Sequence, residues 1–441
     1  MDTLSGGAAT GSIKVRHLIV VLLFVVTTIN NADRATLSIA GSALGKELGF
    51  NSITMGYMLS AYAVAYVIAQ IPGGLLLDRF GSRSIYLLSL ALWSFFTLTQ
   101  GFVGALTGFA AAASLYAMRL AVGFSSAPCF PANARIVSSW FPLAERGTAT
   151  AIFNSAQYFA LVAFAPLMGW LVHAYGWPSV FFVMGGIGLV AVVMFGRFIH
   201  SPLDHPDLRQ GELDFIEKGG ALTRLDQKSV QRKSQLSWSN VRQILGNSTL
   251  LGIYLGQYCI NVLSYFFITW FPIYLVQQRG MSILQAGFFT ALPALCGFAG
   301  GLLGGIASDA ILRRSGSLTM ARKLPLLFGM LLAMLIAVCN YVESPWLVVA
   351  IMGTGFFGKG VAALGWAAVS DTSPKELLGL SFSIFNTAGN LAGIITPVII
   401  GYIVADTGSF DAALVFVSAH CLVAIFSYFV IAGKFERMEL A

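Results

Sequence analysis

Runs of about 20 predominantly apolar residues recur along almost the whole of this chain. A run of that length, wound as an α-helix at about 1.5 Å per residue, spans the hydrocarbon core of a bilayer, about 30 Å. The sequence is 57% hydrophobic and only 10% charged, whereas a soluble domain carries roughly 25% charged residues. The mean hydropathy is +0.78. These features exclude a soluble fold and predict an all-α integral membrane protein.

We predict twelve transmembrane helices, near residues 17–40, 53–77, 84–105, 108–135, 146–172, 178–198, 248–275, 282–307, 322–341, 346–369, 377–404 and 410–432. A long polar stretch, roughly residues 199–246, divides them six and six. We therefore expect an N-terminal six-helix half (1–198), a cytoplasmic middle loop (199–246) and a C-terminal six-helix half (247–441). The 47 glycines suit close helix–helix contacts in lipid.

Basic residues predict the orientation of these helices. Cytoplasmic loops carry an excess of Lys and Arg. With the N-terminus inside, the outer loops hold only Lys46 and Arg279, while the inner side holds the middle loop and Arg79, Arg83, Arg135, Arg146, Arg313, Arg314, Arg322, Lys323, Lys375 and Lys434. We therefore expect both termini in the cytoplasm. The net charge of +7 is a topology signal on this interpretation, and we expect no nucleic-acid partner.

Two internal matches predict a duplicated unit. The pattern Pro-x4-Gly-x4-Ile-Phe-Asn occurs at Pro142–Asn154 and again, with identical spacing, at Pro374–Asn386. At nearly the same offset along the chain, Gly74-x3-Asp78 corresponds to Gly305-x3-Asp309. Transporters built from two such halves bind cargo between the halves, near the midplane of the membrane.

The loop Gly74–Arg83 (GLLLDRFGSR) resembles the signature loop of the major facilitator superfamily. Asp78 can pair with a basic group there in one state and release it in another, so we assign a gating role to this loop through Gly74, Asp78, Arg79 and Arg83, and to its counterpart Asp309. Further segments resemble the anion:cation symporter family, and within it the bacterial glucarate/galactarate permeases: Asn31–Ser38, Arg119–Pro128, Phe130–Arg135, Trp140–Pro142, Pro202–Leu213, Trp270–Val276, Phe357–Gly360 and Arg437–Leu440.

That resemblance implies a secondary transporter of the bacterial inner membrane. It would import a sugar-acid anion together with protons by alternating access. Relatives that carry different sugar acids share most of these segments, so the exact cargo stays open. We expect a monomer without a cofactor.

Four charged residues lie far from the predicted loops: Asp33, Arg34, Arg119 and Lys359. Each costs several kcal/mol in hydrocarbon unless it faces water or a partner, which makes each a functional candidate. Arginine grips a carboxylate with a planar fork, and two arginines beside one aspartate leave positive charge that an anion would neutralise. The alternative for either arginine is a structural partner, Asp33 or a backbone carbonyl. The resemblance favours both arginines as cargo ligands.

Lys359 belongs to the second half, so it is a candidate for the opposite wall of a central cavity. A dicarboxylate has two charged ends, which suits arginine on one wall and lysine on the other. The alternative is a lysine that snorkels from a helix end or pairs locally.

Polar residues within the spans are candidates for the hydroxyl groups of a sugar acid. The resemblance implies Tyr66 and Gln157. Asn390 lies one helical turn from Asn386, and Asn261 is similarly paired with Tyr265. The alternative for each is an interhelical hydrogen bond, which we prefer for Asn386.

One position departs from the family pattern. Symporters of this family carry a carboxylate seven residues after the fourth-helix arginine, and the resemblance implies a role for it in proton coupling. Here that position is Ser126, which leaves Asp33 as the titratable carboxylate of the region. The protein couples protons through Asp33, or is a uniporter or exchanger of a monocarboxylate such as galactonate, or carries an altered residue at Ser126. A transporter-like receptor without turnover is also open.

The sequence argues against an enzyme. No H-E-x-x-H or G-x-S-x-G motif and no P-loop occurs, and the five cysteines show no metal-ligand spacing. We therefore expect a small organic anion, protons and the lipid bilayer as the partners of this chain.

Overall fold

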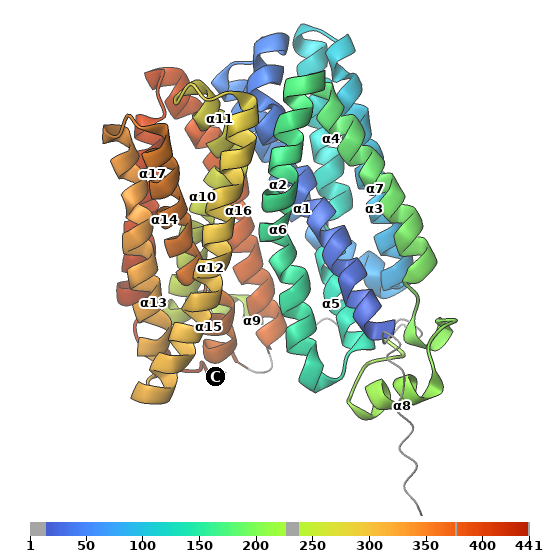
Figure 1. Ribbon diagram of the computed structural model, residues 1–441. Coiled ribbons are helices and arrows are strands. Elements are labelled where there is room, and N and C mark those ends of the chain that lie inside the picture. Colours follow the sequence, from blue (N-terminus) through green and yellow to red (C-terminus); the bar gives the residue numbers. More distant parts are fainter. Residues whose placement is uncertain (1–14, 226–237, 375–376, 440–441) are drawn as a thin grey trace, which may run out of the picture.

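The computed structural model describes residues 15–225, 238–374 and 377–439, and these residues form helices without a strand (Figure 1). The first group is α1 (Val15–Leu48), α2 (Ser52–Phe80), α3 (Ser82–Gln100), α4 (Gly108–Ser126), α5 (Cys129–Trp140), α6 (Leu143–Tyr175) and α7 (Pro178–Phe198). Two short helices follow, α8 (Gln210–Lys218) and α9 (Trp238–Gly246). The second group is α10 (Ser248–Thr269), α11 (Phe271–Gln277), α12 (Ile283–Ser315), α13 (Leu318–Ala333), α14 (Pro345–Val361), α15 (Gly365–Thr372), α16 (Leu378–Thr407) and α17 (Asp411–Phe426).

Twelve candidate membrane spans lie within the described residues, at the places that the apolar runs predict. The membrane-protein fold is thus confirmed. The helices extend beyond the apolar runs, since α1 continues from residue 40 to Leu48 through Lys46. The half boundaries at 198/199 and 246/247 stay a prediction, and Lys375 and Leu440 lie outside the described residues.

Three predicted single helices are each broken in two. The predicted helix 248–275 divides at Trp270, between α10 and α11, and the other two breaks lie in the fourth and tenth spans. The fourth span divides between Ser126 and Cys129, where Pro128 has no N–H to donate. The tenth span divides between Val361 and Gly365 without a proline. The breaks in the fourth and tenth spans lie at corresponding points of the two groups, which is a structural sign of the duplication.

The helix pairs α2–α16 and α6–α12 touch backbone to backbone at one end of the molecule. A Cβ atom on Gly56 would lie 2.6 Å from the Pro397 carbonyl oxygen, and one on Gly401 would lie 2.6 Å from that of Ser52. Gly169 and Gly287 form the second crossing, where a Cβ on Gly169 would lie 3.1 Å from the Gly287 Cα. Such approaches leave room only for glycine. We call this end, with its four glycines, the tight end.

The opposite end carries Arg79, Arg83, Arg146 and Arg322, and we call it the basic end. Here the same helices separate, and a Cβ on Gly305 of α12 or Gly379 of α16 would meet no atom within 4 Å. Figure 1 shows α6 and α12 close together toward their upper ends and far apart toward their lower ends.

The two groups have different polar contacts at the basic end. In the first group Asp78 pairs with Arg135 of α5, and Arg83 donates to the carbonyls of Ile199 and Gly196 at 2.7 and 2.8 Å. Asp78 therefore has the basic partner that we predicted.

In the second group, Arg322 of α13 bridges Asp371 of α15 at 2.9 Å and the Ser308 hydroxyl at 2.7 Å. Asp309 is exposed, and it makes no ion pair with the residues that the structure describes. In the second group, the arginine therefore binds Ser308, the residue next to Asp309, rather than Asp309 itself.

The described part of the middle loop packs on the first group. The guanidinium of Arg16 on α1 contacts Glu145 of α6 at 3.0 Å and Glu212 of α8 at 3.5 Å. It also lies 4.6 Å from the centroid of the Phe215 ring. α8 is thus fastened to both α1 and α6.

Candidate anion site

The charged residues of the first group gather where α1, α2 and α4 meet. Arg34 of α1 lies over the rings of Tyr62 and Tyr66 of α2, at 4.9 and 5.0 Å from their centroids. Arg119 of α4 lies 5.8 Å from the centroid of Tyr62. The two guanidinium groups therefore share one aromatic wall, whose ring faces favour cations. Sequence reasoning missed Tyr62, because a tyrosine within an apolar run carries no distinctive signal.

Several polar atoms of this cluster are buried without a hydrogen-bond partner. They are Nε of Arg34, Nε and Nη1 of Arg119 and both carboxylate oxygens of Asp33. Arg119 Nη2 reaches the backbone carbonyl of Arg34 at 3.5 Å, a long contact of the structural kind that we gave as an alternative. Within the described part of the chain, no ion pair joins Asp33 to either arginine. Unpartnered donors at buried guanidinium groups suit an anion, since leaving them unpaired is unfavourable.

Asp33 lies on the side of α1 that faces α3. It is 2% exposed, and the side chains of Trp93, Thr97 and Arg119 surround it. Trp93 is fully buried, so it packs inside the protein rather than at a membrane interface.

Ser126 lies in the last turn of α4, beside Tyr62. Its hydroxyl donates to the Val122 carbonyl at 2.7 Å. The position of the family carboxylate thus adjoins the arginine cluster through Tyr62, but its side chain is engaged with its own helix.

The second group contributes mainly neutral polar side chains. Tyr265 of α10 lies close enough to Arg34 to interact with its charge, and its hydroxyl donates to Asn390 Oδ1 of α16 at 3.0 Å. Asn390 in turn donates to the carbonyl of Asn386 at 2.8 Å. Asn390 therefore makes the interhelical hydrogen bond that we gave as the alternative to cargo binding. Through Tyr265, it connects α16 to the surroundings of Arg34.

Gln257, Asn261 and Tyr265 follow one another at intervals of four residues along α10. They face glycines: a Cβ on Gly389 would clash with Asn261 Nδ2, and one on Gly393 would clash with the Tyr265 ring. The missing side chains let these polar groups lie against α16. Sequence reasoning missed Gln257, although the i, i+4, i+8 spacing of polar residues in an apolar span would have revealed it.

Lys359 lies in the last turn of α14 and is 8% exposed. Its Nζ lies 5.3 Å from the centroid of Phe356 and 5.9 Å from that of Tyr158, which belongs to α6 of the first group. Tyr158 adjoins Gln157, which is exposed. Cβ atoms on the flanking residues Gly358 and Gly360 would each clash with a carbonyl oxygen of a neighbouring helix. Lys359 is therefore firmly held at the boundary between the two groups.

Arg34 and Lys359 lie at similar depth. The number of residues from Arg34 to Leu48, the last residue of α1, equals the number from Pro345, the first residue of α14, to Lys359. Both of these helix termini lie at the tight end. At about 1.5 Å per residue each is about 21 Å from that end along its helix.

Comparison with known proteins decides the family. The profile described as Major Facilitator Superfamily matches residues 23–339 and again 315–438. The chain belongs to the major facilitator superfamily. It is 55% identical over 427 residues to a protein of Escherichia coli K12 named "Probable galactarate/D-glucarate transporter GudP", covering 96% of this chain and 95% of that one. It is 56% identical to the Bacillus subtilis 168 protein of the same name, covering 97% and 94%.

Solved structures agree on the fold of this superfamily member. A bacterial homologue of the human lysosomal transporter Spinster, crystallised in an inward-facing and occupied conformation, aligns with a TM-score of 0.73 at 16% identity. The alignment covers 98% of this chain and 100% of that one. The family and the names of the relatives, together with the twelve candidate spans, make the chain a multi-pass membrane transporter rather than an enzyme.

Proposed function

We propose that this transporter imports a sugar-acid anion, galactarate or glucarate, across the bacterial inner membrane by alternating access. The observation that carries the proposal is a pair of guanidinium groups, Arg119 buried and Arg34 half-buried, each with a buried N–H donor that no group in the described residues accepts. An anion satisfies those donors and offsets the charge. The names of the relatives that share half of its sequence point to the same class of cargo.

The proposed cargo is held by both its ends. Arg34 and Arg119 bind one carboxylate of a six-carbon diacid, and Lys359 binds the other, because these cations lie on different groups of helices at similar depth. The hydroxyl groups between them meet the polar side chains along the walls: Tyr66, Gln157, Gln257, Asn261, Tyr265 and Asn390. Such donors and acceptors fix the orientation of a polyol.

The conformation described here fits the inward-open state of this cycle. The tight end is closed by the crossings at Gly56–Gly401 and Gly169–Gly287, while the helices diverge at the basic end. The excess of Lys and Arg at the basic end favours its placement in the cytoplasm, with both termini. The Asp78–Arg135 pair lies within the first group, so it stabilises that group and leaves the path between the groups open.

Proton coupling is assigned to Asp33. It is a buried carboxylate that lies beside Arg119 and makes no ion pair with the residues that the structure describes. A proton on Asp33 changes the charge next to the arginine that holds the cargo, and coupling requires such an effect on the two states. The second candidate function is a uniporter or exchanger of a monocarboxylate such as galactonate. Ser126 favours it, because serine does not titrate in the physiological range.

Uptake of labelled galactarate into proteoliposomes tests both functions. We expect saturable counterflow in the absence of a gradient, and accumulation when an inward proton gradient is imposed. The variant Asp33→Asn should retain counterflow and lose accumulation. Accumulation by Asp33→Asn equal to that of the unmodified chain would overturn the role of Asp33.

The variant Ser126→Glu separates the two candidates. Counterflow without accumulation in the unmodified chain, with accumulation restored by Ser126→Glu, would identify the protein as a uniporter or exchanger. Absence of saturable uptake and counterflow for galactarate, glucarate and galactonate would refute the proposed cargo class.

A further inference from the structure

The carboxyl-terminal ends of α5 and α15 are equivalent in the internal repeat. Ser138 and Phe141 at the end of α5 correspond to Ser370 and Ser373 at the end of α15, at the same offset as Pro142 and Pro374. The last carbonyls of a helix have no partner within the helix. Both ends lie at the basic end, where the two groups of helices separate. What satisfies these carbonyls therefore bears on how the inner parts of the fourth and tenth spans are held.

In the first group the arginine comes from the next helix. Arg146 of α6 donates through Nη2 to the carbonyls of Ser138 and Phe141, at 3.1 and 3.5 Å. The middle loop adds to this contact, since Gly220 O accepts from the same nitrogen at 3.1 Å and Leu222 N donates to Ser138 O at 2.9 Å. The chain that follows the first six spans thus returns to hold the end of α5.

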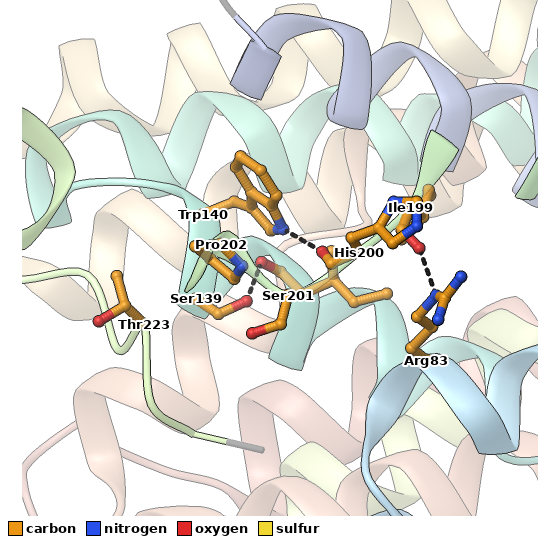
Figure 2. Close-up of a pocket in the computed structure, with 9 residues that line it drawn as sticks. Arg83, Ser139, Trp140, Ile199, His200, Ser201, Pro202 and Thr223 are labelled. Atoms are coloured by element: carbon orange, nitrogen blue, oxygen red, sulfur yellow. Dashed lines mark hydrogen bonds between the residues drawn. The ribbon is translucent and has the colours of Figure 1, made fainter. Parts of the chain in front are cut away.

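The start of the middle loop extends the same contact (Figure 2). Trp140 donates its indole N–H to the His200 carbonyl at 3.1 Å, and Arg83 donates to that of Ile199 at 2.7 Å. Thr223 lines the same hollow. Burial, with the charge of Arg83 nearby, lowers the pKa of His200, so its ring is neutral at pH 7. This part of the loop therefore depends on hydrogen bonds rather than on a charged histidine.

In the second group the arginine comes from the C-terminal segment. Arg437 donates through Nη2 to Ser370 O at 3.1 Å and through Nη1 to Ser373 O at 3.3 Å. Met438 N donates to Thr372 O at 2.8 Å. The position that corresponds to Arg146 in the repeat is Leu378, whose side chain has no hydrogen-bond donor. The same pair of carbonyls is thus bound by arginine in both groups, although the two arginines are not equivalent in the repeat.

The C-terminal segment is itself anchored on other helices. Phe435 is buried and its N–H donates to the Thr319 hydroxyl of α13 at 3.0 Å. Lys323 of α13 donates to the Gly433 carbonyl, and its ammonium lies 5.1 and 5.4 Å from the ring centroids of Phe429 and Phe435. The segment therefore links α15 to α13 and to the end of the last span.

We infer that Arg437 is a positioning residue and that the segment Gly433–Glu439 takes part in the transport cycle, because it holds α15 against the rest of the second group. A cation at the carboxyl-terminal end of a helix stabilises it through the helix dipole as well as through hydrogen bonds. α15 begins directly after the break that follows Lys359 and Val361. With the segment in place, α15 moves together with α13 when the basic end closes. Without Arg437, α15 moves by itself, and closure slows while the cargo site stays intact.

Hydrogen exchange of the purified protein tests this inference independently of transport. We expect Arg437→Ala to lower protection of the α15 amides about fivefold, as the loss of one exposed and one part-buried hydrogen bond implies, and to leave α5 unchanged. Arg146→Ala should give the reverse pattern. Arg437→Lys should restore part of the protection, and Glu439→Ala, an exposed position in the same segment, should change neither helix. Unchanged protection of α15 in Arg437→Ala would overturn the inference.

The transport measurement rests on the proposed function and is made per folded molecule in proteoliposomes. Arg437→Ala should lower the maximal rate of galactarate counterflow about fivefold with KM unchanged, and Arg437→Lys should recover part of the rate. An unchanged maximal rate would show that the segment has no part in the cycle. A failure of the unmodified chain to transport galactarate would count against the proposed function alone, since the exchange pattern of α5 and α15 does not depend on cargo.

Discussion

The two walls of the candidate site differ in kind. The first group presents Asp33, Arg34 and Arg119 around the aromatic rings of Tyr62 and Tyr66. The second presents a row of neutral side chains on α10 and α16, with Lys359 as the charged residue that we assign to it. The first wall is thus suited to recognise charge, and the second to recognise hydroxyl groups and chain length.

This difference shows how a duplicated fold can form a site whose two walls carry different chemical groups. The two halves share the break in the fourth and tenth spans and have nearly the same crossings, yet their central side chains do not correspond. Electrostatic attraction by the first wall supplies affinity for any carboxylate, whereas the second wall determines which carboxylate is bound. The predictions below test this division.

Removal of charge from the first wall should have the largest effect. Arg34→Ala should lower galactarate affinity about thirtyfold or more, because loss of a buried charged partner costs roughly 2–5 kcal/mol. Binding to purified protein measures this, with Arg34→Lys as the matched variant that keeps the charge and loses the fork. Affinity within a few-fold of the unmodified chain would show that charge is not recognised by the first wall.

Lys359→Gln should have the next largest effect, and only on diacids. One charge-assisted contact is worth about 1.5–3 kcal/mol, so we expect galactarate affinity to fall about tenfold to a hundredfold while galactonate affinity stays nearly constant. Equal losses for the two acids would remove Lys359 from the site and leave the second wall without a charge.

Gly401→Leu tests whether both walls belong to one cavity that opens at the basic end. The Cβ would lie 2.6 Å from the Ser52 carbonyl oxygen, and overpacking costs about 1–3 kcal/mol. We expect the tight end to open, with counterflow reduced about tenfold and binding retained. Gly186→Leu on α7, where a Cβ would meet no atom within 4 Å, is the matched control. Normal counterflow by Gly401→Leu would contradict the assignment of the closed end.

Asn390→Ala should have the smallest effect. It removes the hydrogen bond from Tyr265 and one candidate contact to a cargo hydroxyl, so we expect affinity to fall about fivefold. The ratio of galactarate to glucarate affinity should change as well, since the two acids differ in hydroxyl configuration. A loss as large as that of Arg34→Ala would make the second wall as important as the first.

Most of the fold could be predicted from the sequence, because apolar length and charge position are strong physical signals. The twelve spans and the match of Asp78 with a basic partner follow from such signals. The break in the tenth span could not be predicted, since no proline marks it; the glycines near it, Gly358, Gly360 and Gly365, are closely packed against neighbouring residues. Tertiary contacts decide such positions.

The candidate site could be predicted from physical principle most directly where it is charged. Four charged residues could be identified because a charge within the membrane is unfavourable unless it faces water or a partner: Asp33, Arg34, Arg119 and Lys359. Tyr62 was not identified, because aromatic residues in spans pack as often as they bind. Gln257 was missed, although its spacing from Asn261 and Tyr265 would have revealed it. The link from Arg437 to the end of α15 depends on where the C-terminal segment lies, which no periodicity reveals.

The central claim is that a diacid binds by its two ends to two different walls. The most direct test is calorimetric binding of galactarate, galactonate and the neutral polyol galactitol to the purified, unmodified protein. The account predicts that affinity falls about tenfold or more with each carboxylate removed from the ligand. Equal affinities for galactarate and galactonate would contradict it, because the second wall would then contribute nothing to the recognition of charge.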